Sequence, residues 1–121
     1  MTKRILVIED TEDNRQILRD LLSSAGYEII EAVDGESGVA MAKKQLPGLI
    51  LMDIQLPVID GYEATRRLKA DPATRHIPIV AVTSYALVGD EAKAREAGCD
   101  GYVAKPFSPR HLLEKVREFL G

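Results

Sequence analysis

The chain is poor in the residue types that build several common kinds of site. It has a single cysteine, Cys99, no tryptophan, and two histidines, His76 and His111, far apart in the sequence. One cysteine excludes an internal disulfide and fits a reducing compartment. The same scarcity of cysteine and histidine argues against a zinc site.

The chain also lacks a strong excess of one sign of charge and has no long apolar runs. The 16 basic and 19 acidic residues are mixed along the chain, for a net charge of -3. No basic stripe is available for duplex phosphates, so we expect no direct nucleic-acid partner. The apolar run after the basic N-terminus, residues 5–8, is too short for a signal peptide and meets an acid at Glu9. No segment is long enough to span a membrane, and we expect a cytoplasmic protein with no membrane partner.

What is present is an alternation of strand and helix patterns through 121 residues, 45% of them hydrophobic, which suits one domain over residues 1–121. Five strand–helix units predict an α/β fold, a doubly wound parallel sheet with helices on both faces and right-handed crossovers. The predicted strands are Arg4–Ile8, Tyr27–Glu31 (the more polar, hence an edge), Leu49–Met52, Ile79–Val82 and one running from Gly101 to Lys105.

The predicted helices are bounded by capping residues and helix breakers. The first carries Ile17, Leu18, Leu21 and Leu22 on one face and ends at Gly26; the second is capped by Asp34; the third, capped by Asp60, runs Tyr62–Ala70; the fourth covers about Val88–Ala97; the last begins at Pro109.

Polar residues directly follow four of the predicted strands. They are the pair Glu9-Asp10, then Asp53, Thr83 and Lys105. Ligands of open α/β sheets bind beyond the carboxyl ends of the strands, where these side chains would gather. Three carboxylates, a hydroxyl and an ammonium at that edge predict a site for a divalent cation and a phosphoryl group.

The chemistry of such a site follows from its residue types. Mg²⁺ prefers oxygen ligands, so Asp10 and Asp53 would bind it directly and Glu9 directly or through water. An aspartate is a known covalent acceptor of phosphoryl groups, and the transfer needs mainly positioning and charge neutralisation. Lys105 and Thr83 would serve the phosphoryl oxygens.

Each of these residues also has an ordinary structural interpretation. Glu9, Asp10 and Asp53 could be helix caps or solvated acids, Thr83 a plain residue after a strand, and Lys105 a surface lysine. One at a time, the ordinary interpretation is the better one. Their joint placement after four separate strands favours the functional interpretation. An aromatic such as Tyr102 in the last strand is more often a core residue than a switch.

The sequence resembles the receiver domains of two-component response regulators over essentially its whole length. The resemblance is carried by Glu9-Asp10, residues 52–61 (MDIQLPVIDG), Thr83 and Lys105-Pro106, in the order and spacing of that family. It implies a flavodoxin-like fold with sheet order 2-1-3-4-5. With Asn14-Arg15 early in the first helix, the chain is similar to phosphorelay receivers and to single-domain regulators of the DivK kind.

The resemblance further implies the roles of individual residues. Asp53 would accept phosphate from a histidine kinase or a His phosphotransfer protein, with Mg²⁺ held by Glu9, Asp10, Asp53 and the backbone carbonyl of Gln55. Thr83 and Lys105 would bind the phosphoryl oxygens, and the Lys105-Pro106 bond would be cis. Tyr102 would turn inward with Thr83 and change the face formed by the fourth helix, fifth strand and fifth helix, where a downstream protein binds.

Several alternatives share these residues. A phosphate shuttle would pass the phosphoryl group from Asp53 on to a His phosphotransfer protein. A fragment of a larger kinase or transcription factor would carry the same residues, although Met1 and the short C-terminus favour a stand-alone protein. We expect that protein to be a monomer or a weak dimer. An aspartyl-phosphate phosphatase would usually carry an acid where Gln55 stands. A flavin module is disfavoured because Glu9-Asp10 would repel the flavin phosphate. We therefore expect a phosphoacceptor switch and not an enzyme. The resemblance also implies that Tyr85, two residues past Thr83, and Gln55, two residues past Asp53, would help to set the lifetime of the phosphate.

Overall fold

The computed structural model describes residues 3–83 and 90–120, which form five strands and five helices. The strands are β1 (Arg4–Ile8), β2 (Glu28–Ala32), β3 (Leu49–Asp53), β4 (Ile79–Thr83) and β5 (Gly101–Ala104). The helices are α1 (Glu12–Ser24), α2 (Gly35–Gln45), α3 (Gly61–Ala70), α4 (Asp90–Ala97) and α5 (Pro109–Leu120).

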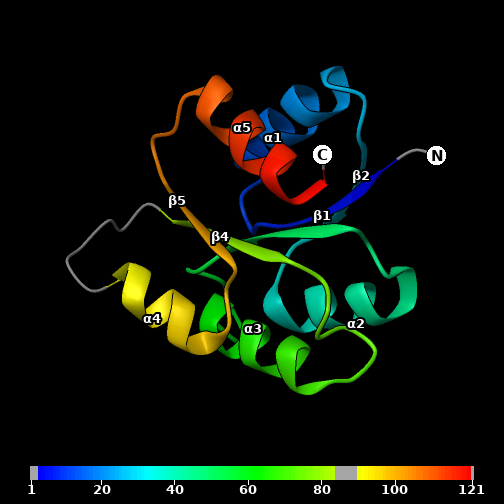
Figure 1. Ribbon diagram of the computed structural model, residues 1–121, viewed down its shortest axis with the longest axis vertical. Coiled ribbons are helices and arrows are strands. Elements are labelled where there is room, and N and C mark those ends of the chain that lie inside the picture. The colour runs from blue at the N-terminus through cyan, green and yellow to red at the C-terminus, as the bar shows by residue number, and fades with distance from the viewer. Residues whose placement is uncertain (1–2, 84–89, 121) are drawn as a thin grey trace.

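The strands form one parallel sheet in the order β2-β1-β3-β4-β5, as the resemblance implied. Helices α1 and α5 cover one face and helices α2, α3 and α4 cover the other (Figure 1). Because every connection is a crossover, the carboxyl ends of all five strands meet at one edge. The α/β class, the strand order and the helices on both faces are confirmed.

Two hydrophobic cores flank the sheet, and successive residues of each strand alternate between them. In β1, Ile5 and Val7 pack under α1 and α5, whereas Leu6 and Ile8 pack against the other layer. Strands β3 and β4 are buried at every position, as expected for strands covered on both faces. Each large side chain buried this way stabilises the fold by about 1.5–3 kcal/mol. Strand β2, at the sheet edge, is only half-buried.

The expected boundaries shift where local hydrogen bonds compete. The predicted strand Tyr27–Glu31 is displaced by one residue, because the Tyr27 amide donates to the Leu22 carbonyl at the end of α1 (3.2 Å) and pairing begins at Glu28. Asp53 and Thr83, expected just after their strands, are the last residues of β3 and β4 and still pair with Val82 and Ala104.

Two of the helices also depart from expectation. Helix α3 begins at Gly61, one residue earlier than predicted, with Asp60 as its cap. The apolar stripe of α1 is narrower than predicted: Leu18 and Leu22 are buried, but the Ile17 side chain is 57% exposed. Val88, the predicted start of the fourth helix, lies outside the described residues. Within residues 3–83 and 90–120, no helix combines the length and apolar character that crossing a membrane requires.

Candidate functional site

The polar residues singled out by the sequence come together at the carboxyl edge of the sheet. Glu9 directly follows β1, Asp53 and Thr83 end β3 and β4, and Lys105 directly follows β5. Since β1, β3, β4 and β5 are successive neighbours in the sheet, these side chains form one row across four strands.

Three carboxylates form the centre of the site. Glu9, Asp10 and Asp53 each offer an oxygen, and these oxygens all lie within 4.8 Å of one another. Glu9 and Asp53 are 2% and 7% exposed, whereas Asp10 lies at the surface. This cluster of three carboxylates, the acidic pocket, is therefore buried at Glu9 and Asp53 and open to solvent at Asp10.

One ammonium group faces this acidic pocket. Lys105 Nζ donates to Glu9 Oε1 at 2.7 Å and lies 4.0 Å from Asp53 Oδ2. The Lys105 side chain is 16% exposed, so its charge acts in a partly desolvated environment, where an ion pair is stronger than at the surface. One ammonium balances only part of the charge of three carboxylates.

The pKa values of the two buried acids, Glu9 and Asp53, are shifted in opposite directions. Burial, followed by the neighbouring Glu9 carboxylate, raises the pKa of Asp53 from 3.8 to about 7. Burial also acts to raise the pKa of Glu9, but the Lys105 ammonium and hydrogen bonds from its other neighbours outweigh it and lower that pKa to about 2. The pKa of Asp10 is raised, chiefly by its hydrogen bond with Glu9. Glu9 is therefore ionised at neutral pH, whereas Asp53 and Asp10 are protonated more easily than ordinary aspartates.

Backbone groups fix the two buried carboxylates in place. The Gln55 amide donates to Asp53 Oδ1 at 3.1 Å, and the Thr11 amide donates to Glu9 Oε2 at 3.2 Å. The loop after β3 closes through the Gly61 amide, which donates to the Ile54 carbonyl at 2.9 Å. A Cβ atom on Gly61 would lie 2.4 Å from the Asp53 carbonyl oxygen, so only glycine lets α3 begin this close to Asp53.

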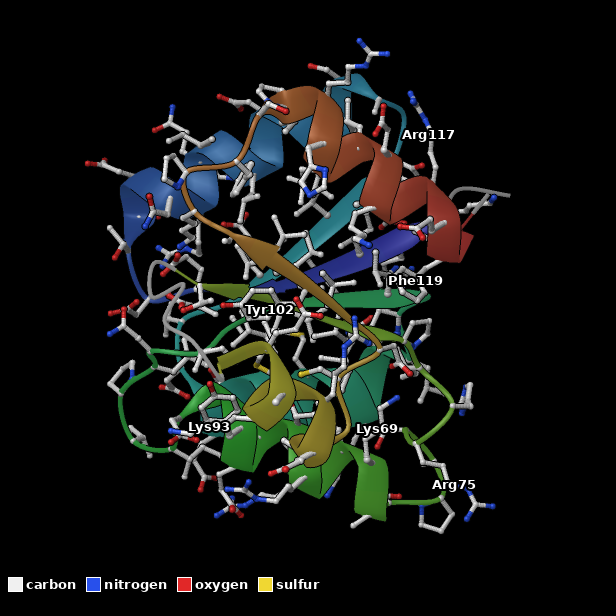
Figure 2. All side chains as sticks on the ribbon, turned by 60° about the vertical axis from the view of Figure 1, so that its left-hand side comes forward. Lys69, Arg75, Lys93, Tyr102, Arg117 and Phe119 are labelled. Atoms are coloured by element: carbon white, nitrogen blue, oxygen red, sulfur yellow. The ribbon has the colours of Figure 1, made fainter. Side chains whose placement is uncertain are left out.

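The remaining predicted residues lie beside this centre on β4 and β5. Thr83 is buried, and its carbonyl accepts from the Lys105 amide at 2.7 Å. Tyr102 pairs with Ala81 in the sheet and packs, half-buried, against the core beneath α3 and α4. Figure 2 shows Tyr102 on β5 between α4 and α5, on the face where Lys93 and Arg117 also lie. The Lys105–Pro106 peptide bond is cis.

The donor set at the acidic pocket fits a hard divalent cation. Three carboxylates with converging oxygens supply the oxygen ligands that Mg²⁺ prefers, and the exposed position of Asp10 gives solvent access for the waters that Mg²⁺ retains. Burial and the neighbouring Glu9 carboxylate raise the pKa of Asp53, and a bound cation would relieve the repulsion between the two carboxylates. The cluster can therefore bind a metal ion.

A groove opens next to the site, between α1 and the loop that follows β5. It has a volume of about 450 Å³ and is lined by Asn14, Ile17, Leu18, Lys105, Pro106 and Phe107. Ile17, which the predicted apolar stripe of α1 placed in the core, is exposed because it lines this groove. Tyr85, which the sequence suggested as a neighbour of the phosphate, lies outside the described residues.

Sequence patterns did not disclose one further contact. Arg15 Nη1 donates to the Glu9 carbonyl at 2.9 Å, and thus bonds the backbone of an acid six residues earlier. In the sequence, the Asn14-Arg15 pair is only a point of resemblance to phosphorelay receivers. No periodicity predicts a contact between a helical side chain and a loop carbonyl.

Comparisons with known proteins agree with this geometry. The family model of the response regulator receiver domain matches residues 5–117. The chain is 44% identical over 121 residues to the polar-differentiation response regulator DivK of Brucella ovis, covering 100% of this chain and 98% of that protein.

Solved structures give the same answer. The receiver domain of a sensor histidine kinase from Pseudomonas aeruginosa, with a magnesium ion coordinated in its active site cleft, is similar at a TM-score of 0.93 and 38% identity, covering 100% of this chain and 99% of that one. The chemotaxis protein CheY4 of Vibrio cholerae is similar at a TM-score of 0.92 and 27% identity, covering 98% and 99%. With its fold, its row of site residues and these relatives in agreement, the chain belongs to the response regulator receiver domains of two-component signalling.

Proposed function

We propose that this chain is a phosphorylation switch in which Asp53 accepts a phosphoryl group from a phosphohistidine in the presence of Mg²⁺. The observation that carries the proposal is the placement of Lys105, 2.7 Å from Glu9 and 4.0 Å from Asp53, at the edge of a cluster of three carboxylates. This arrangement supports the proposal because it places a positive charge beside the carboxylate that would accept the phosphoryl group, and such transfer depends mainly on positioning and charge neutralisation.

Glu9, Asp10 and Asp53, with the backbone carbonyl of Gln55, would hold the Mg²⁺ ion. The bound ion would neutralise carboxylate and phosphoryl charge together. Gln55 lies next to the acceptor carboxylate, since its amide donates to Asp53 Oδ1 at 3.1 Å.

Asp53 would act as the nucleophile. One of its oxygens forms a bond to phosphorus while the bond between phosphorus and the donor imidazole nitrogen breaks, and the bonding electron pair stays on that nitrogen. Lys105 offers a point charge and Thr83 a hydroxyl to the phosphoryl oxygens. Because the transition state is loose, positioning and charge neutralisation supply most of the catalysis, and no further acid or base is needed. The protein thus promotes its own phosphorylation and remains a switch, not a turnover enzyme.

The groove beside the site suits the donor protein. It is lined by Ile17 and Phe107 and reaches Lys105, so an apolar side chain seated there would bring a neighbouring phosphohistidine to Asp53. We assign this groove to a histidine kinase or a His phosphotransfer protein.

Phosphorylation would then change the opposite side of the site. A phosphoryl group carries about -1.5 to -2 charges at neutral pH, in place of one carboxylate charge. Thr83 would move toward the new oxygens, and Tyr102 on β5 would turn inward behind it. The α4-β5-α5 face, where Tyr102 lies between the two helices, would present a changed surface to a downstream protein (Figure 2).

Transfer from a radiolabelled His phosphotransfer protein tests the proposal. Label should move to the wild-type chain with Mg²⁺, but not with a chelator and not to Asp53→Asn. Absence of transfer to wild type from a panel of such donors would refute the role of phosphohistidine as donor. Rapid return of label to the unphosphorylated donor protein would identify a phosphate shuttle, and persistence of label on Asp53 would identify a terminal switch.

A further inference from the structure

Arg15 ties the loop that carries the acidic pair to the body of the protein. Its Nη1 donates to the Glu9 carbonyl at 2.9 Å, and its Nε lies 3.4 Å from Glu31 Oε1 on β2. It also pairs with Glu12 at the start of α1. With its side chain only 12% exposed, Arg15 is held in this position from three sides.

We infer that Arg15 is a positioning residue for the metal-binding acids, and that it acts by holding the peptide between Glu9 and Asp10. The inference rests on the metal site of the proposed function. Arg15 itself touches neither the carboxylates of the cluster nor the phosphoryl position; its effect would pass through the Glu9 carbonyl.

The remaining contacts of the loop show why this bond matters. The Glu9 amide donates to the Ala32 carbonyl at 3.0 Å, which fixes the start of the segment, and the Thr11 amide donates to the Glu9 side chain at 3.2 Å. The Glu9 carbonyl belongs to the peptide that leads directly into Asp10. Asp10 lies at the surface, and the orientation of this peptide sets the direction in which its side chain leaves the backbone. Groups that orient metal ligands typically change metal affinity 10–100-fold when removed.

The neighbouring arginine provides an internal comparison. Arg19, one turn along α1, pairs with the same two acids: its guanidinium lies 2.8 Å from Glu31 Oε2 and 3.2 Å from Glu12 Oε1. Arg15 and Arg19 therefore make similar contributions of charge and of ion pairing to this corner of the molecule. Within residues 3–83 and 90–120, it is the Arg15 guanidinium that donates to the Glu9 carbonyl.

Charge alone predicts the opposite result from positioning. A cation near the acidic pocket repels Mg²⁺, so removing either arginine would tighten Mg²⁺ binding if only charge mattered. Positioning predicts weaker binding when Arg15 is removed and little change when Arg19 is removed. The direction of the change, and its restriction to Arg15, separate the two accounts.

The test compares Arg15→Met with Arg19→Met, both of which keep an unbranched apolar stem and remove the guanidinium group. Mg²⁺ affinity is measured by titration calorimetry on the full chain, with urea unfolding to verify that each variant is folded. We expect the Mg²⁺ Kd of Arg15→Met to rise about tenfold and that of Arg19→Met to stay within about twofold of wild type. If Arg15→Met does not fold, Arg15→Gln is the second variant, with the same expectation because its shorter amide does not span from Glu9 to Glu31.

A second readout is the Mg²⁺ dependence of phosphorylation by a small acyl phosphate. Arg15→Met should need about tenfold more Mg²⁺ for half-maximal rate and still reach a near wild-type rate at saturation. Equal Mg²⁺ affinity in wild type and folded Arg15→Met, tighter binding in Arg15→Met, or the same loss in both variants would overturn the inference. A wild-type chain that bound no Mg²⁺ would overturn the metal site of the proposed function and this inference with it.

Discussion

Lys105 bonds Glu9 directly, at 2.7 Å, and stands 4.0 Å away from Asp53. The ammonium thus stabilises the negative charge of Glu9 more than that of Asp53. Against the effect of burial, Lys105 and the other hydrogen-bonding neighbours lower the pKa of Glu9 to about 2, whereas burial and the Glu9 carboxylate raise the pKa of Asp53 to about 7. Asp53, the carboxylate proposed to receive phosphate, is thus the buried acid whose negative charge Lys105 neutralises less.

Removal of the ammonium should destabilise the metal-free protein. In Lys105→Met the almost fully buried Glu9 loses its ion-pair partner, and breaking a buried pair from one side lowers the free energy of unfolding by roughly 3 kcal/mol. Urea unfolding with a chelator measures the loss. Lys115→Met is the matched control, because its partner Glu118 is 59% exposed and surface pairs contribute at most about 1 kcal/mol. Equal losses in both variants would show that Lys105 has no special electrostatic role.

Asp53 should make the metal-free protein less stable as the pH rises. Its pKa is about 7 in the folded chain and would be near its ordinary value of 3.8 in the unfolded chain, so between these values the folded state holds the extra proton and stability falls with increasing pH. Asp53→Asn removes this dependence. The free energy of unfolding of the variant minus that of wild type should therefore grow between about pH 4 and pH 7, by an amount on the order of a few kcal/mol.

That comparison is made in a chelator, and Mg²⁺ then supplies a control. Added Mg²⁺ should stabilise wild type at pH 8 more than it stabilises Asp53→Asn, because the cation relieves the charge that the variant lacks. A difference between variant and wild type that stays constant from pH 4 to pH 8 would contradict the raised pKa of Asp53.

The groove beside the site should discriminate between donors. Ile17→Ser removes an apolar residue that is 57% exposed and lines the groove. The rate of phosphoryl transfer from a His phosphotransfer protein should fall about tenfold, whereas the rate from a small acyl phosphate should stay unchanged. Leu46→Ser is the control, since Leu46 is similarly exposed at 54% but follows α2, away from the groove. A wild-type rate from the protein donor would remove the groove from the docking surface.

Thr83 should couple the phosphoryl group to the output face without being required to load it. Thr83→Ala should still gain a phosphoryl group at Asp53, but the Tyr102 ring should keep its unphosphorylated environment. Fluorotyrosine NMR reads this directly, with Tyr102→Phe used to assign the signal. An identical shift of the Tyr102 signal in wild type and Thr83→Ala on phosphorylation would refute the coupling.

Much of this arrangement could be predicted because its signals are local in the sequence. Buried strands of a parallel sheet are continuous apolar runs, and the polar residue that ends each run marks the edge where ligands bind. Glu9, Asp10, Asp53 and Lys105 could thus be placed together before any coordinates were known. The order 2-1-3-4-5 came from the resemblance, since adjacency of β1 and β3 leaves no mark in either strand.

The features that could not be predicted from the sequence depend on contacts between segments that are far apart in the chain or on small differences in distance. The start of β2 moved by one residue because the end of α1 takes the Tyr27 amide. Ile17 matched the helical period but lies exposed because a groove opens there between α1 and the loop after β5. The unequal sharing of Lys105 between Glu9 and Asp53 is a matter of about an ångström, which no spacing of residues encodes.

The most direct test of the central claim is the intact mass of the protein after incubation with Mg²⁺ and a small acyl phosphate. The account predicts one added phosphoryl group on wild type, none on Asp53→Asn, and none when Mg²⁺ is chelated; phosphate release is followed in parallel, so that a short-lived adduct is still detected. An adduct of equal yield on Asp53→Asn, or neither an adduct nor phosphate release from folded wild type, would contradict the assignment of Asp53 as the phosphoacceptor.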